Sequence, residues 1–230
     1  MTKETFRLIE NYMISCAGDS AHDKEHIYRV LYNALTIAKT EGTVDYDILI
    51  SACLLHDIAR KEQAEDPSVC HATLGSEKAY RFLTDNGFDE AFAEKVRHCI
   101  KVHRFRKNTP PESIEAKILF DADKLDVSGA IGIARTLLYQ GAMSEPLYSL
   151  LPDGTPSNGE NDPEPSFFQE YKFKLEKIYS NFFTNEGKRL AAEKQRSAIV
   201  FYNDLFNEIK TPYEKGKTEL KKLIQEQDNG

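Results

Sequence analysis

Several features that define whole classes of protein are missing from this sequence. No apolar stretch reaches the roughly 20 residues that a membrane-spanning helix needs, and the polar, amphipathic start MTKETFRLIENYM is unlike a signal peptide. The four cysteines (Cys16, Cys53, Cys70 and Cys99) contain no CxxC pair, which excludes a disulfide framework and zinc-finger spacing. We therefore expect a cytoplasmic protein with no membrane partner, whose cysteines are buried reduced thiols.

An excess of positive charge is also missing. The formal net charge is −7 over 230 residues, and non-specific binding to a nucleic-acid backbone needs a basic surface. We therefore expect no nucleic-acid polymer as a partner. A small anionic ligand stays open, because a bound metal ion and a few local cations can hold a phosphate inside an acidic protein.

Alternating apolar and polar residues, the pattern of a half-buried strand, are missing as well, and helical spacing dominates. The fold class is therefore expected to be all-α. The helix around ILISACLLH is the most apolar and should be central and buried, with the polar loop KEQAEDPS after it. In the first part of the chain, helices are expected over residues 4–15, 23–39, 46–60, 72–85, 88–103 and 111–125.

The stretch from Leu150 to Ser166 interrupts this pattern, because it is dense in proline, glycine, asparagine and aspartate. We expect a core domain with the functional site over residues 1–145, a loop or insert over 146–166, and a C-terminal helical extension of the same domain over 167–230. Amphipathic helices are expected over 167–183 and 186–209, before a lysine-rich tail that frays or forms a short helix. These helices could pack on the core or form the face of a homodimer.

Histidine is absent from the second half of the chain, and all six histidines lie between residues 22 and 103. His56 and Asp57 follow the apolar run ACLL, where burying an imidazole and a carboxylate is costly unless both are satisfied. One interpretation is that both bind a metal ion that other helices also contact. The alternative is a hydrogen-bonded core histidine beside a solvated aspartate, because the dipeptide is common by chance.

His26 lies beside the apolar face of its helix, and His22 lies one turn earlier. These two side chains could form a His-x3-His zinc pair. The other interpretation gives His22 and Asp23 a role in capping the helix or in supporting the site from outside.

The segment ILFDADKLD carries three aspartates after an apolar run: Asp121, Asp123 and Asp126. Helical spacing is expected to point them in different directions. One of the three should face inward, and the other two should be solvated.

Together these residues resemble the HD superfamily of metal-dependent phosphohydrolases, whose pattern is a histidine, an HD pair and a later aspartate. The matches are His26 in HDKEHIYRV, His56 and Asp57 in LLHDIAR, and Asp123 in DADKLD, where the family's ADxL context selects Asp123 over its neighbours. The phrases DADKLDVSGAIGIART and KLEKIYSNFFTNEGKRLAAEK are similar to a bacterial branch of small stand-alone HD hydrolases. The resemblance covers about residues 4–208. It implies an HD-domain helical bundle with C-terminal amphipathic helices packed on it, and these four residues as metal ligands.

Two more histidines are similar to those of branches that bind a second metal after the HD pair. They are His71, followed by Gly75-Ser76, and His103 in IKVHRFR. They could extend a mononuclear site to a dinuclear one, or contact phosphate and water beside a single metal, which the sequence slightly favours. His98 lies about 140° round the helix from His103 and is not expected to be a ligand.

The implied shell of imidazoles and carboxylates suits a divalent transition metal. Mn²⁺ is expected first, with Fe²⁺, Co²⁺, Ni²⁺, Zn²⁺ or Mg²⁺ as alternatives. Such an ion would activate water against a phosphorus centre, with Asp57 or another acid taking the proton. Arg29 should brace the site or contact phosphate. The cations expected to bind phosphate are Arg60, Lys61, Arg104, Arg106 and Lys124.

The resemblance therefore implies a phosphohydrolase that acts on a small phosphorylated molecule, above all a nucleotide. Cleavage of a phosphomonoester and of a pyrophosphate bond are both open. A non-catalytic metal-containing binding or regulatory module is the alternative, and the loss of one of the four ligands would have indicated it.

Overall fold

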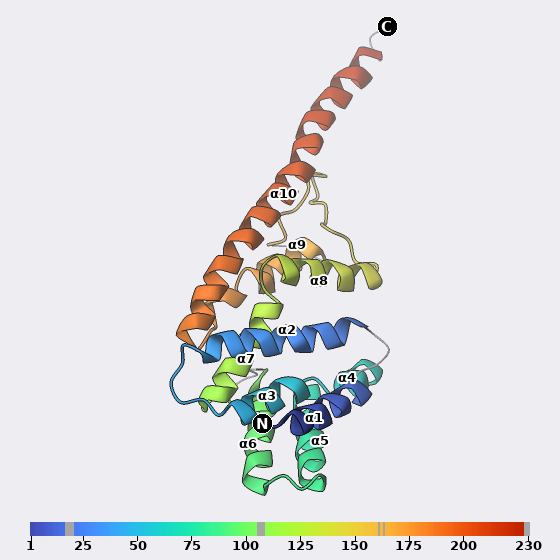
Figure 1. The fold of residues 1–230 in the computed structure, drawn as a ribbon. Coiled ribbons are helices and arrows are strands. Elements are labelled where there is room, and N and C mark those ends of the chain that lie inside the picture. The colour runs from blue at the N-terminus through green and yellow to red at the C-terminus, as the bar shows by residue number, and fades with distance from the viewer. Residues whose placement is uncertain (17–20, 105–108, 161, 163, 228–230) are drawn as a thin grey trace. The chain divides into compact units, whose positions relative to one another are not determined.

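The computed structural model of the protein describes the backbone of residues 1–16, 21–104, 109–160, 162 and 164–227, and the side chains of these residues except 21–23 and 225–227. Within these ranges the chain is helical and has no β-strand, apart from one isolated bridge between Leu150 and Pro156 (Figure 1). The predicted all-α class is thus confirmed. No described helix combines the length and the apolar character that crossing a bilayer requires.

The chain divides into two compact units. The first contains residues 1–126 and 182–190, and the second contains residues 127–181 and 191–230. This division reflects compactness alone, and the domain boundaries predicted near residues 145 and 166 stay a prediction.

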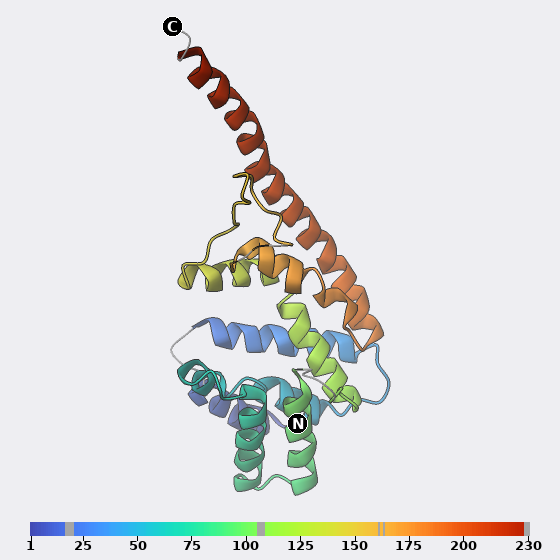
Figure 2. The ribbon, with the colours of Figure 1, turned by 180° about the vertical axis from the view of Figure 1, so that it is seen from behind.

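The first unit is built around one apolar helix, α3. This helix contacts α1, α2, α5, α6 and α7, and Leu49, Leu54 and Leu55 on it are fully buried. The N-cap Asp45 accepts hydrogen bonds from the backbone N–H groups of Asp47 and Ile48, which starts the helix. The helices of the unit are α1 (Lys3–Cys16), α2 (Ala21–Ala38), α3 (Tyr46–Leu55), α4 (Arg60–Glu65), α5 (His71–Asp85), α6 (Glu90–Val102) and α7 (Ile114–Asp126). Figures 1 and 2 show α5 and α6 side by side as a hairpin.

Helix α3 ends at Leu55, earlier than the predicted end at residue 60. The backbone N–H groups of Ile58 and Arg60 bond to the carbonyl groups of Leu55 and Asp57, so a tight turn replaces the last helical turn. His56 and Asp57 therefore lie in this turn. The predicted polar loop over residues 61–68 was wrong for residues 61–65, which lie in α4 and contain the good helix formers lysine, glutamate, glutamine and alanine.

The second unit has an aromatic core. Phe167, Phe168, Tyr171 and Tyr202 are buried together, and the rings of Tyr171 and Tyr202 stack with their centroids 4.1 Å apart. Its elements are α8 (Gly129–Ala142), α9 (Phe167–Glu170), the π-helical turn η1 (Tyr171–Leu175), the 3-10 turn η2 (Ile178–Ser180) and most of α10 (Asn185–Gln227). The predicted helix over 167–183 is therefore broken into short pieces. The tail, which was predicted to fray or to form a short helix, is part of α10 up to Gln227, and α10 continues through Pro212.

Two aspartates that were expected to be solvated are buried. Asp121 and Asp126 are 0% and 1% exposed. Asp121 accepts hydrogen bonds from the backbone N–H groups of Phe183 and Thr184 and from the Thr184 hydroxyl, and Thr184 Oγ1 in turn accepts from the N–H of Gly187. Asp121 thus anchors the start of α10, although burial raises the pKa of its carboxyl.

Replacing Asp121 should destabilise the protein. We expect Asp121→Ala to lower the free energy of unfolding by about 2–4 kcal/mol, because it removes an anchor at a helix start and leaves buried donors without an acceptor. Urea denaturation followed by circular dichroism measures this change. The exposed Asp85→Ala is the control. A loss below about 0.5 kcal/mol for Asp121→Ala, within the range of ordinary surface changes, would contradict the anchoring role.

Candidate metal centre

Four histidines converge within the first unit from four separate segments. His26 lies on α2, His56 directly follows α3, His71 is the first residue of α5, and His103 directly follows α6. All four are buried, none being more than 4% exposed. The structure therefore brings together residues that are spread over more than 75 positions of the sequence.

Backbone carbonyl groups orient two of these rings. His56 Nδ1 lies 2.7 Å from the carbonyl oxygen of Cys53, and His103 Nδ1 lies 2.6 Å from that of Ile100. A carbonyl oxygen only accepts, so Nδ1 carries the hydrogen in each ring. In the neutral ring Nε2 then offers a lone pair, which is the form that binds a metal ion.

Side chains orient the other two rings in the same way. His26 Nδ1 lies 2.6 Å from Asp126 Oδ2, and His71 Nδ1 lies 2.5 Å from Gln63 Oε1. The amide nitrogen of Gln63 donates to the carbonyl of Val69, which supports this placement of the amide oxygen. All four Nε2 atoms are thus left for the interior of the site.

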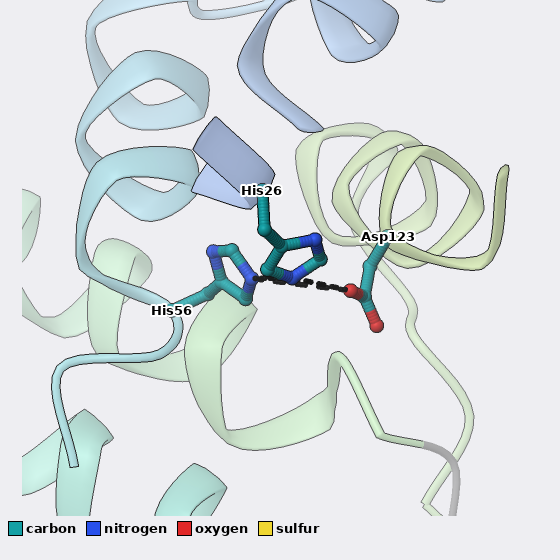
Figure 3. A group of neighbouring side chains, drawn as sticks. All are labelled: His26, His56 and Asp123. Carbon is teal, nitrogen blue, oxygen red and sulfur yellow. Dashed lines mark hydrogen bonds and ion pairs between the residues drawn. The ribbon is translucent and has the colours of Figure 1, made fainter. Parts of the chain in front are cut away.

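The first candidate metal group contains His26, His56 and Asp123, shown in Figure 3. His26 Nε2 lies 3.3 Å from Asp123 Oδ1 and 3.4 Å from His56 Nε2. The three ligand atoms lie within 4.8 Å of one another. Two imidazole Nε2 atoms that face each other beside a carboxylate need a positive charge between them, supplied by a proton or a metal ion, so this group fits a metal ion.

The second candidate group contains Asp57, His71 and His103. Asp57 Oδ1 lies 3.3 Å from His71 Nε2 and 3.7 Å from His103 Nε2. None of these three buried atoms has a hydrogen-bond partner among the described residues. Buried polar atoms are rarely left unpaired, so this group also fits a cation.

Asp57 faces both groups. Its Oδ2 atom lies 3.5 Å from His26 Nε2 and 3.7 Å from His56 Nε2, while its Oδ1 atom faces the second group. Its position in the turn after α3, rather than within the helix, allows this central place. Asp57 is therefore buried and not solvated, so the alternative of a core histidine beside a solvated aspartate does not hold.

The charges of the site favour a bound cation. Burial alone would lower the pKa of His26, but hydrogen bonds with Asp123, Asp126 and Asp57 outweigh it and raise this pKa to about 11. Burial lowers the pKa of His71 to about 3 and that of His103 to about 4, so both rings are neutral and can offer a lone pair to a metal ion. The charges of His56 and Arg60 and a hydrogen bond from His26 hold the pKa of Asp57 well below its usual range despite burial.

The predicted cations differ in how close they lie to this site. Arg60 Nε lies 2.8 Å from Asp57 Oδ2, and Arg104 Nη1 lies 3.3 Å from His71 Nδ1. Lys61 is exposed on α4, and the Lys124 ammonium lies over the Phe120 ring at 4.7 Å from its centroid. Arg106 and the side chains of His22 and Asp23 lie outside the described residues.

Two residues beside the metal groups were not predicted to support the site. Gln63 has no motif that marks it. Asp126 could have been found, because residues three apart share a helix face and Asp126 follows Asp123 by three positions. Arg29, which was expected to brace the site or contact phosphate, donates to both oxygens of Asp126 at 2.6 and 3.0 Å and so acts as a brace.

The fold and the site define a known class of protein. The HD domain family model matches residues 24–128, which include all the candidate ligands. A solved HD-superfamily hydrolase from Bacillus thuringiensis is 30% identical, with 90% of this chain and 95% of that chain covered and a TM-score of 0.67. The chain belongs to the HD superfamily.

The chain is also similar to individual proteins of Bacillus subtilis and Listeria innocua. The YpgQ protein of Bacillus subtilis is 29% identical over 194 residues, which cover 83% of this chain and 85% of YpgQ. A crystal structure of YpgQ in complex with ADP has a TM-score of 0.69 to this structure at 27% identity and covers 89% of this chain and 97% of that one. A protein from Listeria innocua is 28% identical, with 91% and 98% covered and a TM-score of 0.68.

Proposed function

We propose that this protein is a metal-dependent phosphohydrolase that acts on a nucleotide through a site for two divalent ions. The observation that carries the proposal is the arrangement of two metal-binding groups around one carboxylate, Asp57. In this proposal His26, His56, Asp123 and Asp57 Oδ2 hold one ion. Asp57 Oδ1, His71 and His103 hold the other ion. This role for the two histidines replaces the contact with phosphate and water that the sequence slightly favoured. Mn²⁺ is the expected metal.

The ions would polarise a phosphoryl group and lower the pKa of a nearby water. The side chains would hold and orient the reactants. Asp57 Oδ1 would accept a hydrogen bond from the attacking water, which is the catalytic role expected for this residue. The Arg60 guanidinium is 40% exposed, so a phosphate oxygen can approach it and form the paired hydrogen bonds that arginine favours. Lys61, Lys124 and Arg106 stay predicted phosphate contacts.

A cavity beside the second metal group supports a substrate with a chain of phosphates. Its volume is about 180 Å³, and it is lined by Lys101 and Arg104 together with Cys70, Thr73 and Thr109. The first turn of α5 also lies there, and helix N-termini favour anions. The binding of ADP by YpgQ agrees with a nucleoside di- or triphosphate as the substrate.

Lys101 tests this phosphate cavity, because it lines the cavity without contacting a metal-group residue. We expect Lys101→Ala to raise KM for a nucleoside diphosphate about 3–10-fold, about 1 kcal/mol of lost ion pairing, with kcat unchanged. Lys95→Ala is the matched control, since Lys95 is exposed on the same helix and lines a different cavity. Equal KM values for the two variants would contradict this use of the cavity.

The function itself is tested by a substrate panel. The purified protein with Mn²⁺ is incubated with nucleoside mono-, di- and triphosphates, and phosphate and pyrophosphate are separated among the products. Release of either product supports the proposal and identifies the bond. The absence of turnover on every phosphoester would overturn it and favour a non-catalytic metal-containing module.

A further inference from the structure

The four histidines of the metal centre differ in the partner of Nδ1. His56 and His103 donate to neutral backbone carbonyls, and His71 faces a neutral amide oxygen. His26 alone faces a carboxylate, that of Asp126, at 2.6 Å. Asp126 is 1% exposed, and Arg29 holds both of its oxygens.

A carboxylate behind an imidazole makes the ring a stronger ligand. It fixes the hydrogen on Nδ1, orients the ring and increases the electron density on Nε2. A neutral oxygen does the same more weakly. The group of His26, His56 and Asp123 therefore contains the strongest imidazole donor of the centre, held by a buried and braced carboxylate.

The second group has the opposite features. His71 Nδ1 lies 2.5 Å from the Gln63 amide oxygen and 3.3 Å from Arg104 Nη1, which is a hydrogen-bond donor. A donor at Nδ1 favours the ring form with hydrogen on Nε2, and that form offers no lone pair at Nε2, the atom that faces the second group. The Gln63 amide oxygen must therefore be a stronger partner of His71 Nδ1 than Arg104, so that the hydrogen stays on Nδ1 and Nε2 can bind a metal ion. The positive charge of Arg104 also opposes a cation here.

We infer that the two groups bind their ions with unequal strength, with Asp126 as the positioning residue of a tight site and Gln63 as that of an exchangeable site. This inference rests on the proposed two-ion function. The first ion stays with the chain. The second ion leaves and returns with the supply of free metal, so the second group sets how activity follows metal concentration.

Calorimetric titration of the metal-free full chain with Mn²⁺ tests the inequality. We expect two binding events whose dissociation constants differ at least about 10-fold. Asp126→Asn should weaken the tight event by about 10–100-fold, the usual effect of removing such a partner, and leave the weak event unchanged. Asp126→Glu should restore part of the affinity, because it returns a carboxylate.

Asp121→Asn is the matched control. It makes the same change in a buried carboxylate on the same helix, but this carboxylate anchors α10 and contacts neither metal group. It should lower the melting temperature without changing either dissociation constant. Gln63→Leu is the complementary variant and should weaken only the weak event.

Two binding events of equal affinity would overturn the inference and leave the two-ion proposal intact. So would two events that both variants, Asp126→Asn and Gln63→Leu, weaken alike. Binding of one ion, or of none, would instead overturn the two-ion site of the proposed function.

Discussion

Asp57→Asn is expected to leave the protein without either metal ion and to lower hydrolysis by at least about 10³-fold. The amide keeps the shape of the side chain but removes the negative charge that both metal groups face. An ion contributes several kcal/mol to stabilising the charge of the transition state, and each 1.4 kcal/mol changes the rate tenfold. Asp57 lies within 4 Å of histidines of both groups, so this substitution should have the largest effect on the centre.

Elemental analysis of the purified variant measures bound metal, and the substrate panel measures turnover. The exposed Asp85→Asn is the control for the chemical change, and circular dichroism checks that the variant is folded. Stoichiometric metal in Asp57→Asn would show that the ligand assignment is wrong. Lost turnover with retained metal would give Asp57 a catalytic role without a ligand role.

Removing the metal from the unaltered protein should abolish turnover and also lower its thermal stability. The candidate ligands come from five separate segments of the chain between residues 26 and 123, so only the folded chain assembles the site. An ion at 100 times its dissociation constant then stabilises the fold by about 2.7 kcal/mol. For a chain of this size we expect a rise in Tm of about 5–10 °C on adding Mn²⁺ after chelation.

Scanning calorimetry of the chelated protein, with and without Mn²⁺, measures this shift. Asp57→Asn is the control and should show little or no shift. An unchanged Tm in the unaltered protein, or full turnover after chelation, would contradict a metal centre that depends on the fold.

The helical class and most helix positions could be predicted from the sequence, because the 3.6-residue spacing of apolar side chains is a local property. The end of α3 could not, because the turn at His56 is set by hydrogen bonds to Leu55 and Asp57 that compete with one more helical turn. The burial of Asp121 was missed because its partners, Phe183 and Thr184, lie more than 60 positions away.

The sequence by itself determined an all-α chain of the HD superfamily, with His26, His56, Asp57 and Asp123 in the family's order. Only the tertiary structure decided that Asp57 faces two candidate metal groups, that His71 and His103 lie beside it, and that Asp126 contacts His26. A motif specifies which residues are present. Which atoms meet depends on how separate helices pack, as in the hydrogen bond between His26 and Asp126, which joins residues 100 positions apart.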